Sequence, residues 1–216
     1  MKMFDSILEG VKSIFNGGGK RYTRIFLRPL MMDFLEGKKF DLCIEIGAFE
    51  GYTSNILVEH LNENGRLICI DPLKDQFYVD NLTEEYIEGN KTKWGYFKGQ
   101  YKRFKHNVKE HLKSGKIVLI RKLSKDAFKD LKGYKGKVDF CYVDGDHRAQ
   151  GVYNDGKSCF ELIRVGGFIF FDDYERKEFG RQVTKEGVDR FLKEYKGKYK
   201  IISKERQIII QKIKNI

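Results

Sequence analysis

The sequence is poor in several residue types that mark particular classes of protein. Its 216 residues include two prolines and one tryptophan, and no apolar run is long enough to cross a bilayer. None of the four cysteines forms a C-x-x-C pair, which leaves a zinc site or a dithiol redox motif without support. Asp5 and Glu9 interrupt the apolar pattern of residues 1–15, so we expect an amphipathic helix there rather than a signal peptide. These absences favour a cytoplasmic protein with reduced thiols and no membrane partner.

Composition and length predict one globular domain. The chain is 41% hydrophobic and 34% charged, and its length suits a single α/β domain. The formal net charge is +11, which attracts polyanions, and residues 98–106 mix bases with aromatic side chains. No nucleic-acid recognition motif accompanies this charge. A solvated, lysine-rich surface is therefore the favoured interpretation, nucleic acid remains a second choice of partner, and a homo-oligomer stays open.

Hydrophobic periodicity predicts a helical extension followed by a doubly wound sheet. We expect the extension at residues 1–38, with helices at 5–15 and 23–36, and the domain at residues 39–216. An aromatic-rich excursion at about residues 73–116 is long enough to hold extra helices or a lid. Apolar runs that read as strands, the last two as a closing hairpin, are residues 40–46, 66–70, 117–120, 140–143, 168–171, 199–202 and 207–213. A turn at Asn64 and Gly65 is expected to lead into the second of these strands.

Acidic residues follow two of these predicted strands. Asp144 and Asp146 come after residues 140–143, and Asp172 and Asp173 come after residues 168–171, with a helical pattern between the two strands. A right-handed crossover puts the carboxyl ends of both strands on one edge of the sheet, so the acids converge there. A divalent cation or a shared proton usually offsets such repulsion. Oxygen ligands suit magnesium, manganese or calcium better than zinc.

A glycine-containing turn follows the first predicted strand. It runs from Glu45 to Thr53, where Gly47 allows a tight turn and Gly51 lets a helix begin near the sheet. Asp71 ends the next strand, where an acid can bind both ribose hydroxyls. Neither a dinucleotide nor a nucleoside triphosphate motif is present. Because Glu45 suits a cationic ligand, the turn favours S-adenosylmethionine, which carries a sulfonium and an ammonium group.

These segments resemble class I S-adenosylmethionine-dependent methyltransferases. The sequences IEIGAFEGYTS, LICIDP, YVDGDH and LIRVGGFIFFDDY are most similar to the metal-dependent O-methyltransferases that act on small molecules, such as catechols and antibiotic sugars. The resemblance covers residues 40 to the C-terminus. It implies an α/β, Rossmann-like sheet of order 3-2-1-4-5-7-6, with helices on both faces and the last strand antiparallel.

The resemblance also implies roles for individual residues. Asp144, Asp172 and Asp173 match the three ligands of a Mg²⁺ ion, while Asp146 and His147 occupy positions at which relatives keep a general base. The choice between those two bases stays open. The positions that match the binding site of S-adenosylmethionine are Glu45, Gly47, Ala48, Gly51, Thr53, Asp71, Ser124, Lys125 and Asp144.

The reaction that we expect is methyl transfer from S-adenosylmethionine to a hydroxyl group of a small molecule. Trp94, Tyr96, Tyr174 and residues 21–23 are candidates for the wall of the acceptor site. Two alternatives remain: a methyltransferase that acts on nucleic acid, and a module that binds S-adenosylmethionine without catalysis. The chain lacks an Asn/Asp-Pro-Pro-aromatic tetrapeptide and a Pro-Cys pair, which disfavours two classes of base methylation.

Overall fold

The computed structural model describes residues 29–74, 99–175 and 183–215. The predicted helix at 5–15, the candidate residues 21–23, and Trp94 with Tyr96 lie outside these ranges. The chain forms two compact units, residues 1–38 and 39–216. In the first unit, the structure describes the helix α2 (Pro29–Leu35). The part of the predicted helix at residues 23–36 that the structure describes is helical from Pro29 to Leu35.

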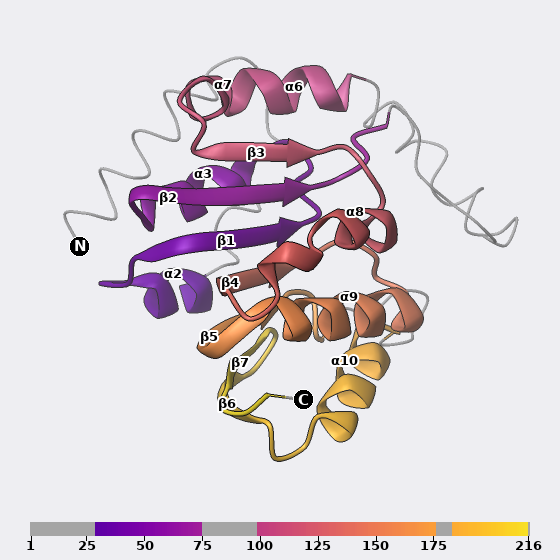
Figure 1. Cartoon of the computed structure of the whole chain (residues 1–216). Helices are drawn as coiled ribbons and strands as arrows, with labels where there is room; N and C mark the ends of the chain where they lie inside the picture. The colour runs from indigo at the N-terminus through magenta and orange to yellow at the C-terminus, as the bar shows by residue number, and fades with distance from the viewer. Residues whose placement is uncertain (1–28, 75–98, 176–182, 216) are drawn as a thin grey trace, which may run out of the picture. The chain divides into compact units, whose positions relative to one another are not determined.

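The second unit contains a mixed sheet of seven strands in the order β3-β2-β1-β4-β5-β7-β6 (Figure 1). The first five strands of this order pair in parallel, whereas β7 is antiparallel to both β5 and β6. This arrangement confirms the fold class and the strand order that the resemblance implied. The strands are β1 (Phe40–Ile46), β2 (Leu61–Ile70), β3 (Ile117–Ile120), β4 (Val138–Val143), β5 (Ile163–Phe171), β6 (Tyr199–Lys204) and β7 (Ile208–Lys212).

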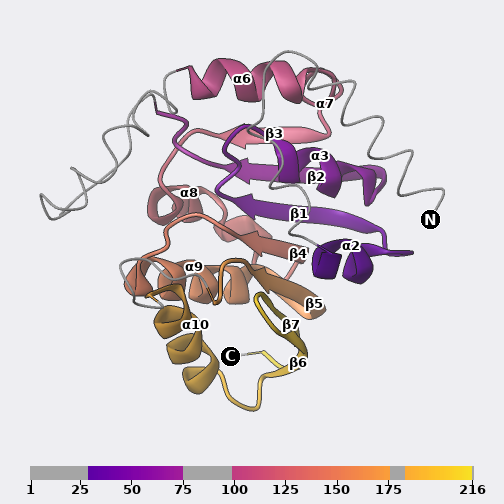
Figure 2. The same cartoon turned by 180° about the vertical axis from the view of Figure 1, so that it is seen from behind.

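Helices cover both faces of this sheet. The helix α9 packs on β4 and β5 and has α10 beside it, whereas α3 packs on β2 from the opposite side (Figures 1 and 2). The pair α6 and α7 lies beside the β3 edge in both views. The described helices of this unit are α3 (Tyr52–Glu59), α6 (Gln100–Asn107), α7 (Lys109–Lys113), α8 (Ser124–Asp130), the 3-10 turn η3 (Lys132–Tyr134), α9 (Ala149–Leu162) and α10 (Val183–Glu194).

One predicted turn is wrong. Asn64 and Gly65 were expected to precede the second strand, but they lie inside β2. The pairing of β1 with β2 shifts between Phe40 and Leu42, so the additional residues of β2 are accommodated in an irregular stretch. A side chain at position 65 would come within 2.7 Å of the carbonyl oxygen of Phe40, and glycine avoids that contact.

The core consists of apolar side chains between the sheet and the helices of each face. Aromatic rings dominate its centre, where Phe160 and Phe171 both contact Phe191 of α10. All four cysteines are buried and free. Within the described residues, no helix combines the length and the apolar character needed to cross a membrane.

Candidate active site at the carboxyl edge of the sheet

The carboxyl ends of the parallel strands are level with one another. Ile46 of β1 pairs with Ile70 of β2 and with Val143 of β4, which in turn pairs with Phe171 of β5. The ladder continues one residue beyond the strands, because Asp144 N donates to Ile46 O at 2.9 Å. In the same way, Asp172 N donates to Val143 O at 3.0 Å and Gly47 N donates to Ile70 O at 2.9 Å. The predicted turn and the predicted acids therefore lie along one edge.

Two loops touch at the switch point of the sheet, between β1 and β4, where the strand order reverses. Gly47 has φ +87°, and a Cβ atom there would lie 2.0 Å from the carbonyl oxygen of Asp144 and 2.9 Å from the Cα atom of Gly145. Only glycine permits both this backbone conformation and this approach. Open α/β sheets bind their ligands at such a switch point.

The next part of the turn is fixed by a second glycine. Gly51 precedes α3 with φ +82°, and a Cβ atom at this position would come 2.6 Å from Cγ1 of Val108. The neighbouring predicted residues Ala48 and Thr53 are buried. Glu50 is buried as well, and Arg103 Nε of α6 donates to its Oε1 atom at 2.6 Å. The turn is therefore held by the sheet on one side and by α6 on the other.

Glu45 lies below this turn and is completely buried. Its Oε2 atom accepts hydrogen bonds from Ser54 Oγ at 2.5 Å and from Cys69 Sγ at 3.3 Å. Burial and the Glu45 carboxylate raise the pKa of the Cys69 thiol. The glutamate thus connects β1, β2 and the first turn of α3.

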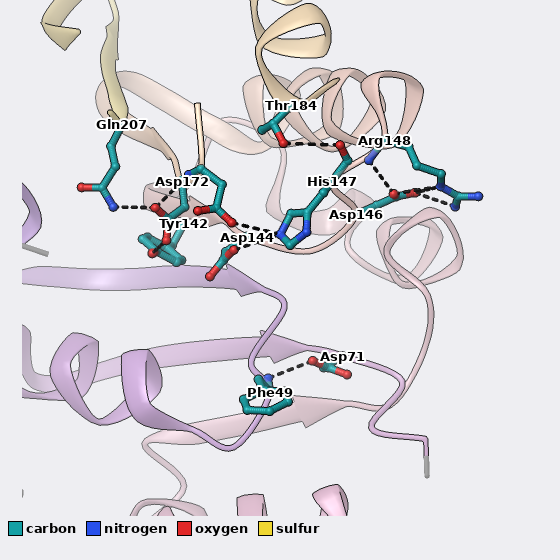
Figure 3. A network of polar contacts seen from close by, with 11 residues as sticks. Phe49, Asp71, Tyr142, Asp144, Asp146, His147, Arg148, Asp172, Thr184 and Gln207 are labelled. Carbon is teal, nitrogen blue, oxygen red and sulfur yellow. Dashed lines mark hydrogen bonds and ion pairs between the residues drawn. The ribbon is translucent and has the colours of Figure 1, made fainter. Parts of the chain in front are cut away.

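Asp71 receives backbone hydrogen bonds on both carboxylate oxygens. Phe49 N donates to Oδ2 at 2.8 Å and Leu73 N donates to Oδ1 at 2.7 Å, and Figure 3 shows the contact between Phe49 and Asp71. Burial raises the pKa of this carboxyl group, and the two N–H donors oppose that shift. Each oxygen keeps a further lone pair, so a ribose hydroxyl can still donate to it.

The acids after β4 and β5 surround a histidine. His147 Nε2 lies 3.5 Å from Asp144 Oδ1, the contact that Figure 3 shows, and 3.4 Å from Asp173 Oδ2. Ligand atoms of these three residues all lie within 4.8 Å of one another. Asp173 has φ 54°, a left-handed conformation that is uncommon for a residue other than glycine. Two carboxylates and an imidazole form a donor set that suits a divalent cation.

Asp172 is placed differently from its neighbour. Its carboxylate accepts hydrogen bonds from the hydroxyl of Tyr142, from Gln207 Nε2 at 2.5 Å and from the backbone N of Asp173 at 2.8 Å. Figure 3 shows Tyr142 and Gln207 converging on this side chain. The predicted ligand set and the group around His147 therefore share Asp144 and Asp173, whereas Asp172 supports the backbone of Asp173.

Asp146 points to the start of α9. Its Oδ1 atom accepts from Arg148 N and Arg148 Nε, both at 2.9 Å, and its Oδ2 atom accepts from Arg148 Nη2 at 2.6 Å. Gly151 provides space for this carboxylate, because a Cβ atom there would lie 2.3 Å from Asp146 Oδ2. Of the two predicted bases, His147 is the one that lies beside Asp144 and Asp173.

Two of the positions that match an S-adenosylmethionine site, Ser124 and Lys125, lie at the start of α8. Ser124 is the first residue of α8 and is half-buried, and Lys125 beside it is exposed. The Ser124 side chain is hydrogen-bonded to Asp155 of α9, a residue that the sequence analysis did not single out. Also missed were the residues that hold the acids in place, which are Tyr142, Arg148 and Gln207.

Comparisons with known proteins agree with this geometry. A family profile described as "Methyltransferase domain" matches residues 44–174. The chain belongs to this family. Its domain is a class I S-adenosylmethionine-dependent methyltransferase domain, as the sheet order and the loop after β1 also indicate.

Similar structures show the same fold at low sequence identity. An O-methyltransferase from Bacillus cereus, crystallised with SAH, is 15% identical with TM-score 0.57, covering 99% of this chain and 91% of its own. The O-methyltransferase TomG from Streptomyces achromogenes, in complex with SAM, is 15% identical with TM-score 0.56, covering 85% and 77%. A putative rRNA-methylase from Clostridium thermocellum is 16% identical with TM-score 0.58, covering 87% and 96%.

A curated relative is known by sequence as well. The uncharacterized protein R132 of Acanthamoeba polyphaga mimivirus is 28% identical over 142 residues, which are 65% of this chain and 54% of the relative. The chain thus spans about half the length of this relative.

Proposed function

We propose that this protein is a metal-dependent O-methyltransferase that transfers the methyl group of S-adenosylmethionine to a hydroxyl group of a small molecule. The observation that carries the proposal is the convergence of Asp144, His147 and Asp173 beside the loop contact between Gly47 and Asp144. This arrangement puts a candidate cation site next to the switch point at which the methyl donor binds. The O-methyltransferases among the similar structures support the reaction class.

The donor site in this proposal consists of the turn after β1 together with Asp71 and the start of α8. Gly47, Ala48, Gly51 and Thr53 form the turn, and its backbone approaches the ligand closely because Gly47 has no side chain. Asp71 accepts hydrogen bonds from the ribose hydroxyls. Ser124, Lys125 and the backbone of Asp144 border the adenosine, and Glu45 holds the turn from below through Ser54.

The residues around His147 fit a divalent cation, of which Mg²⁺ is our first choice. Asp144 and Asp173 would hold the ion, and Asp172 would keep Asp173 in its left-handed conformation through the backbone hydrogen bond. When bound, such an ion supplies Lewis acidity that makes a substrate hydroxyl easier to deprotonate.

His147 is the base in this proposal. Its imidazole accepts the proton of the substrate hydroxyl, and the carboxylates of Asp144 and Asp173, at 3.5 and 3.4 Å from Nε2, orient the ring. Asp146 is less suited to this task because both of its oxygens are bound by Arg148. The substrate oxygen then attacks the methyl group in line with the departing sulfur.

Methyl transfer to catechol, flavonoid and sugar acceptors tests this function. We expect S-adenosylhomocysteine to bind the wild-type protein in calorimetry, and we expect transfer to at least one acceptor to stop when EDTA is added. Asp144→Ala and Asp173→Ala should stop it as well. Transfer that continues with EDTA and in both variants would refute the metal-dependent mechanism, and binding without transfer to any acceptor would favour a module without catalysis.

A nucleic-acid acceptor is the second candidate. The net charge of +11 and the exposed bases Lys102, Lys105 and His106 of α6 favour it, as does the fold shared with a putative rRNA-methylase. An RNA gel shift at two salt concentrations tests it, because the affinity of a polyanion falls steeply with salt. Tight binding of RNA, together with methyl transfer to that RNA, would replace the small-molecule proposal.

A further inference from the structure

The helix α10 is hydrogen-bonded to both sides of the candidate cation site. Thr184 lies in its first turn, and the Oγ1 atom of this residue donates to the backbone carbonyl oxygen of His147 at 3.3 Å (Figure 3). Further along the helix, Asp189 Oδ1 accepts a hydrogen bond from the hydroxyl of Tyr174 at 2.8 Å. Because Tyr174 directly follows Asp173, one helix holds the loop of His147 and the loop of Asp173.

Thr184 lies in a close contact between α10 and α9, and 3% of the residue is exposed. A Cβ atom at Gly187 of α10 would come 2.3 Å from the carbonyl oxygen of Ala149, the first residue of α9. The glycine therefore lets the two backbones approach and holds Thr184 against the loop that carries His147. A hydroxyl that is buried in such a contact needs a partner, and the carbonyl oxygen of His147 supplies one.

The second contact of α10 fixes the residue after Asp173. Tyr174 is 3% exposed, and Lys185, which pairs with Asp189, lies over its ring at 5.1 Å from the centroid. Asp173 has φ 54°, and such a left-handed residue persists where the surrounding structure over-determines its backbone. Asp172 holds this backbone from one side through the hydrogen bond from Asp173 N, and Tyr174 holds it from the other.

The separation of His147 and Asp173 depends on these contacts. The two residues belong to loops that follow different strands, β4 and β5, and His147 Nε2 lies 3.4 Å from Asp173 Oδ2. Hydrogen bonds from one helix to both loops fix the position of each loop relative to the other. Precision matters here, because misplacing a reacting group by about 1 Å can lower a rate strongly.

We propose that Thr184 and Asp189 are positioning residues of the candidate active site, which hold His147 and Asp173 at the separation that the reaction requires. Thr184 acts on the proposed base through the backbone of His147. Asp189 acts on the proposed metal ligand Asp173 through Tyr174. This inference rests on the proposed methyltransferase function and extends its site to α10.

Crystal structures of the metal-free wild type, Thr184→Val and Thr184→Ser test the placement of the imidazole without any activity. Valine has the shape of threonine but cannot donate a hydrogen bond. In Thr184→Val we expect the distance from His147 Nε2 to Asp173 Oδ2 to increase by roughly 1 Å or more. Thr184→Ser keeps the hydroxyl, so the ring should remain in its wild-type position. A ring that does not move in Thr184→Val would overturn the role of Thr184.

Methyl-transfer kinetics separate positioning from stability. With an acceptor that the wild type methylates, Thr184→Val should lower kcat by roughly threefold to tenfold, the range expected for one hydrogen bond. The KM for S-adenosylmethionine should not change, and Thr184→Ser should restore kcat. Tyr153→Phe is the matched control, because the Tyr153 hydroxyl donates from α9 to Glu194 at the other end of α10. Equal losses of kcat in Thr184→Val and Tyr153→Phe would mean that these contacts only stabilise the fold, and would overturn the inference.

Tyr174→Phe tests the second contact and remains decisive if Thr184→Val does not fold. Without the hydroxyl that Asp189 binds, the Mn²⁺ affinity measured by electron paramagnetic resonance should fall roughly threefold to tenfold. Thr184→Val should leave it unchanged, because Asp144 and Asp173 remain. Unchanged Mn²⁺ affinity in Tyr174→Phe would overturn the role of Asp189. A wild type that binds neither Mn²⁺ nor S-adenosylhomocysteine would refute the proposed function, while the metal-free structures would still decide whether Thr184 positions His147.

Discussion

Gly47 and Asp144 are in backbone contact across the switch point of the sheet. A Cβ atom on Gly47 would lie 2.0 Å from the carbonyl oxygen of Asp144, at a residue with φ +87°. The contact joins the loop that we assign to the methyl donor to the loop that carries a proposed metal ligand. The first prediction follows from it.

Gly47→Ala should destabilise the protein and abolish binding of S-adenosylhomocysteine. The left-handed backbone costs about 1 kcal/mol for alanine, and overpacking of the two loops adds roughly 1–3 kcal/mol. Urea denaturation and calorimetry measure the two effects. Gly115→Ala is the matched control, because Gly115 has φ +74° with nothing within 4 Å of the new methyl group. Equal losses of stability in the two variants would contradict the close contact between Gly47 and Asp144.

His147→Ala should separate proton transfer from metal binding. Loss of the base should lower kcat by roughly 10²–10⁴-fold, the usual contribution of general base catalysis. Because Asp144 and Asp173 remain, the affinity for Mn²⁺, measured by electron paramagnetic resonance, should change by less than about tenfold, whereas Asp173→Ala should lose Mn²⁺ binding. A His147→Ala protein that no longer binds Mn²⁺ would instead make the imidazole a ligand.

Asp172→Ala should weaken metal binding although the side chain points away from His147. Without the carboxylate, the backbone N of Asp173 loses its acceptor, and Tyr142 and Gln207 lose the hydrogen bonds that they donate to Asp172. We expect Mn²⁺ affinity to fall roughly 10–100-fold, as for other residues that orient ligands, with S-adenosylhomocysteine affinity unchanged. Tyr142→Phe is the control, since it removes one donor and leaves the contact with Asp173 N in place. Equal losses of Mn²⁺ affinity would argue against this role.

Asp155→Asn should stabilise the fold at alkaline pH. The folded pKa of about 7 exceeds the usual value of 3.8, so the folded state holds the proton more tightly than the unfolded state does. Stability is therefore lost as the pH rises from about 4 to about 7 and is level above that range. At about 1.4 kcal/mol per pH unit, acting over the two units from pH 5 to about 7, the gain of the variant should be roughly 3 kcal/mol greater at pH 8 than at pH 5.

The measurement is urea denaturation of both proteins at the two pH values. Asp126→Asn is the control, because this exposed carboxyl group has its pKa lowered by the hydrogen bond from Lys129. Its variant should show no gain at pH 8. If the stability of Asp155→Asn relative to the wild type does not depend on pH, the raised pKa of the buried Asp155 carboxyl group is contradicted.

The sequence predicted the sheet well because apolar runs and their endings are local signals. The ends of the strands at Ile46, Ile120, Val143 and Phe171 match the prediction, since glycine or polar residues follow each one. The predicted turn at Asn64–Gly65 was wrong because β2 already pairs with β1 at Leu61, and the two residues lie in the irregular stretch before the pairing resumes at Arg66. The burial of Asp155 could have been predicted, because this acid occupies an apolar position in the helical pattern of α9.

The sequence alone determined that acids, a histidine and a glycine turn follow the strands of one parallel sheet, because strand ends and crossovers bring such residues to one edge. Only the tertiary structure decided which of them meet. The direction of each side chain depends on partners far away in the chain: Gln207 and Tyr142 bind Asp172. By contrast, the left-handed backbone of Asp173 allows its carboxylate to lie beside His147. Hydrogen bonds between distant residues have no local signature, so their geometry appears only when the chain is folded.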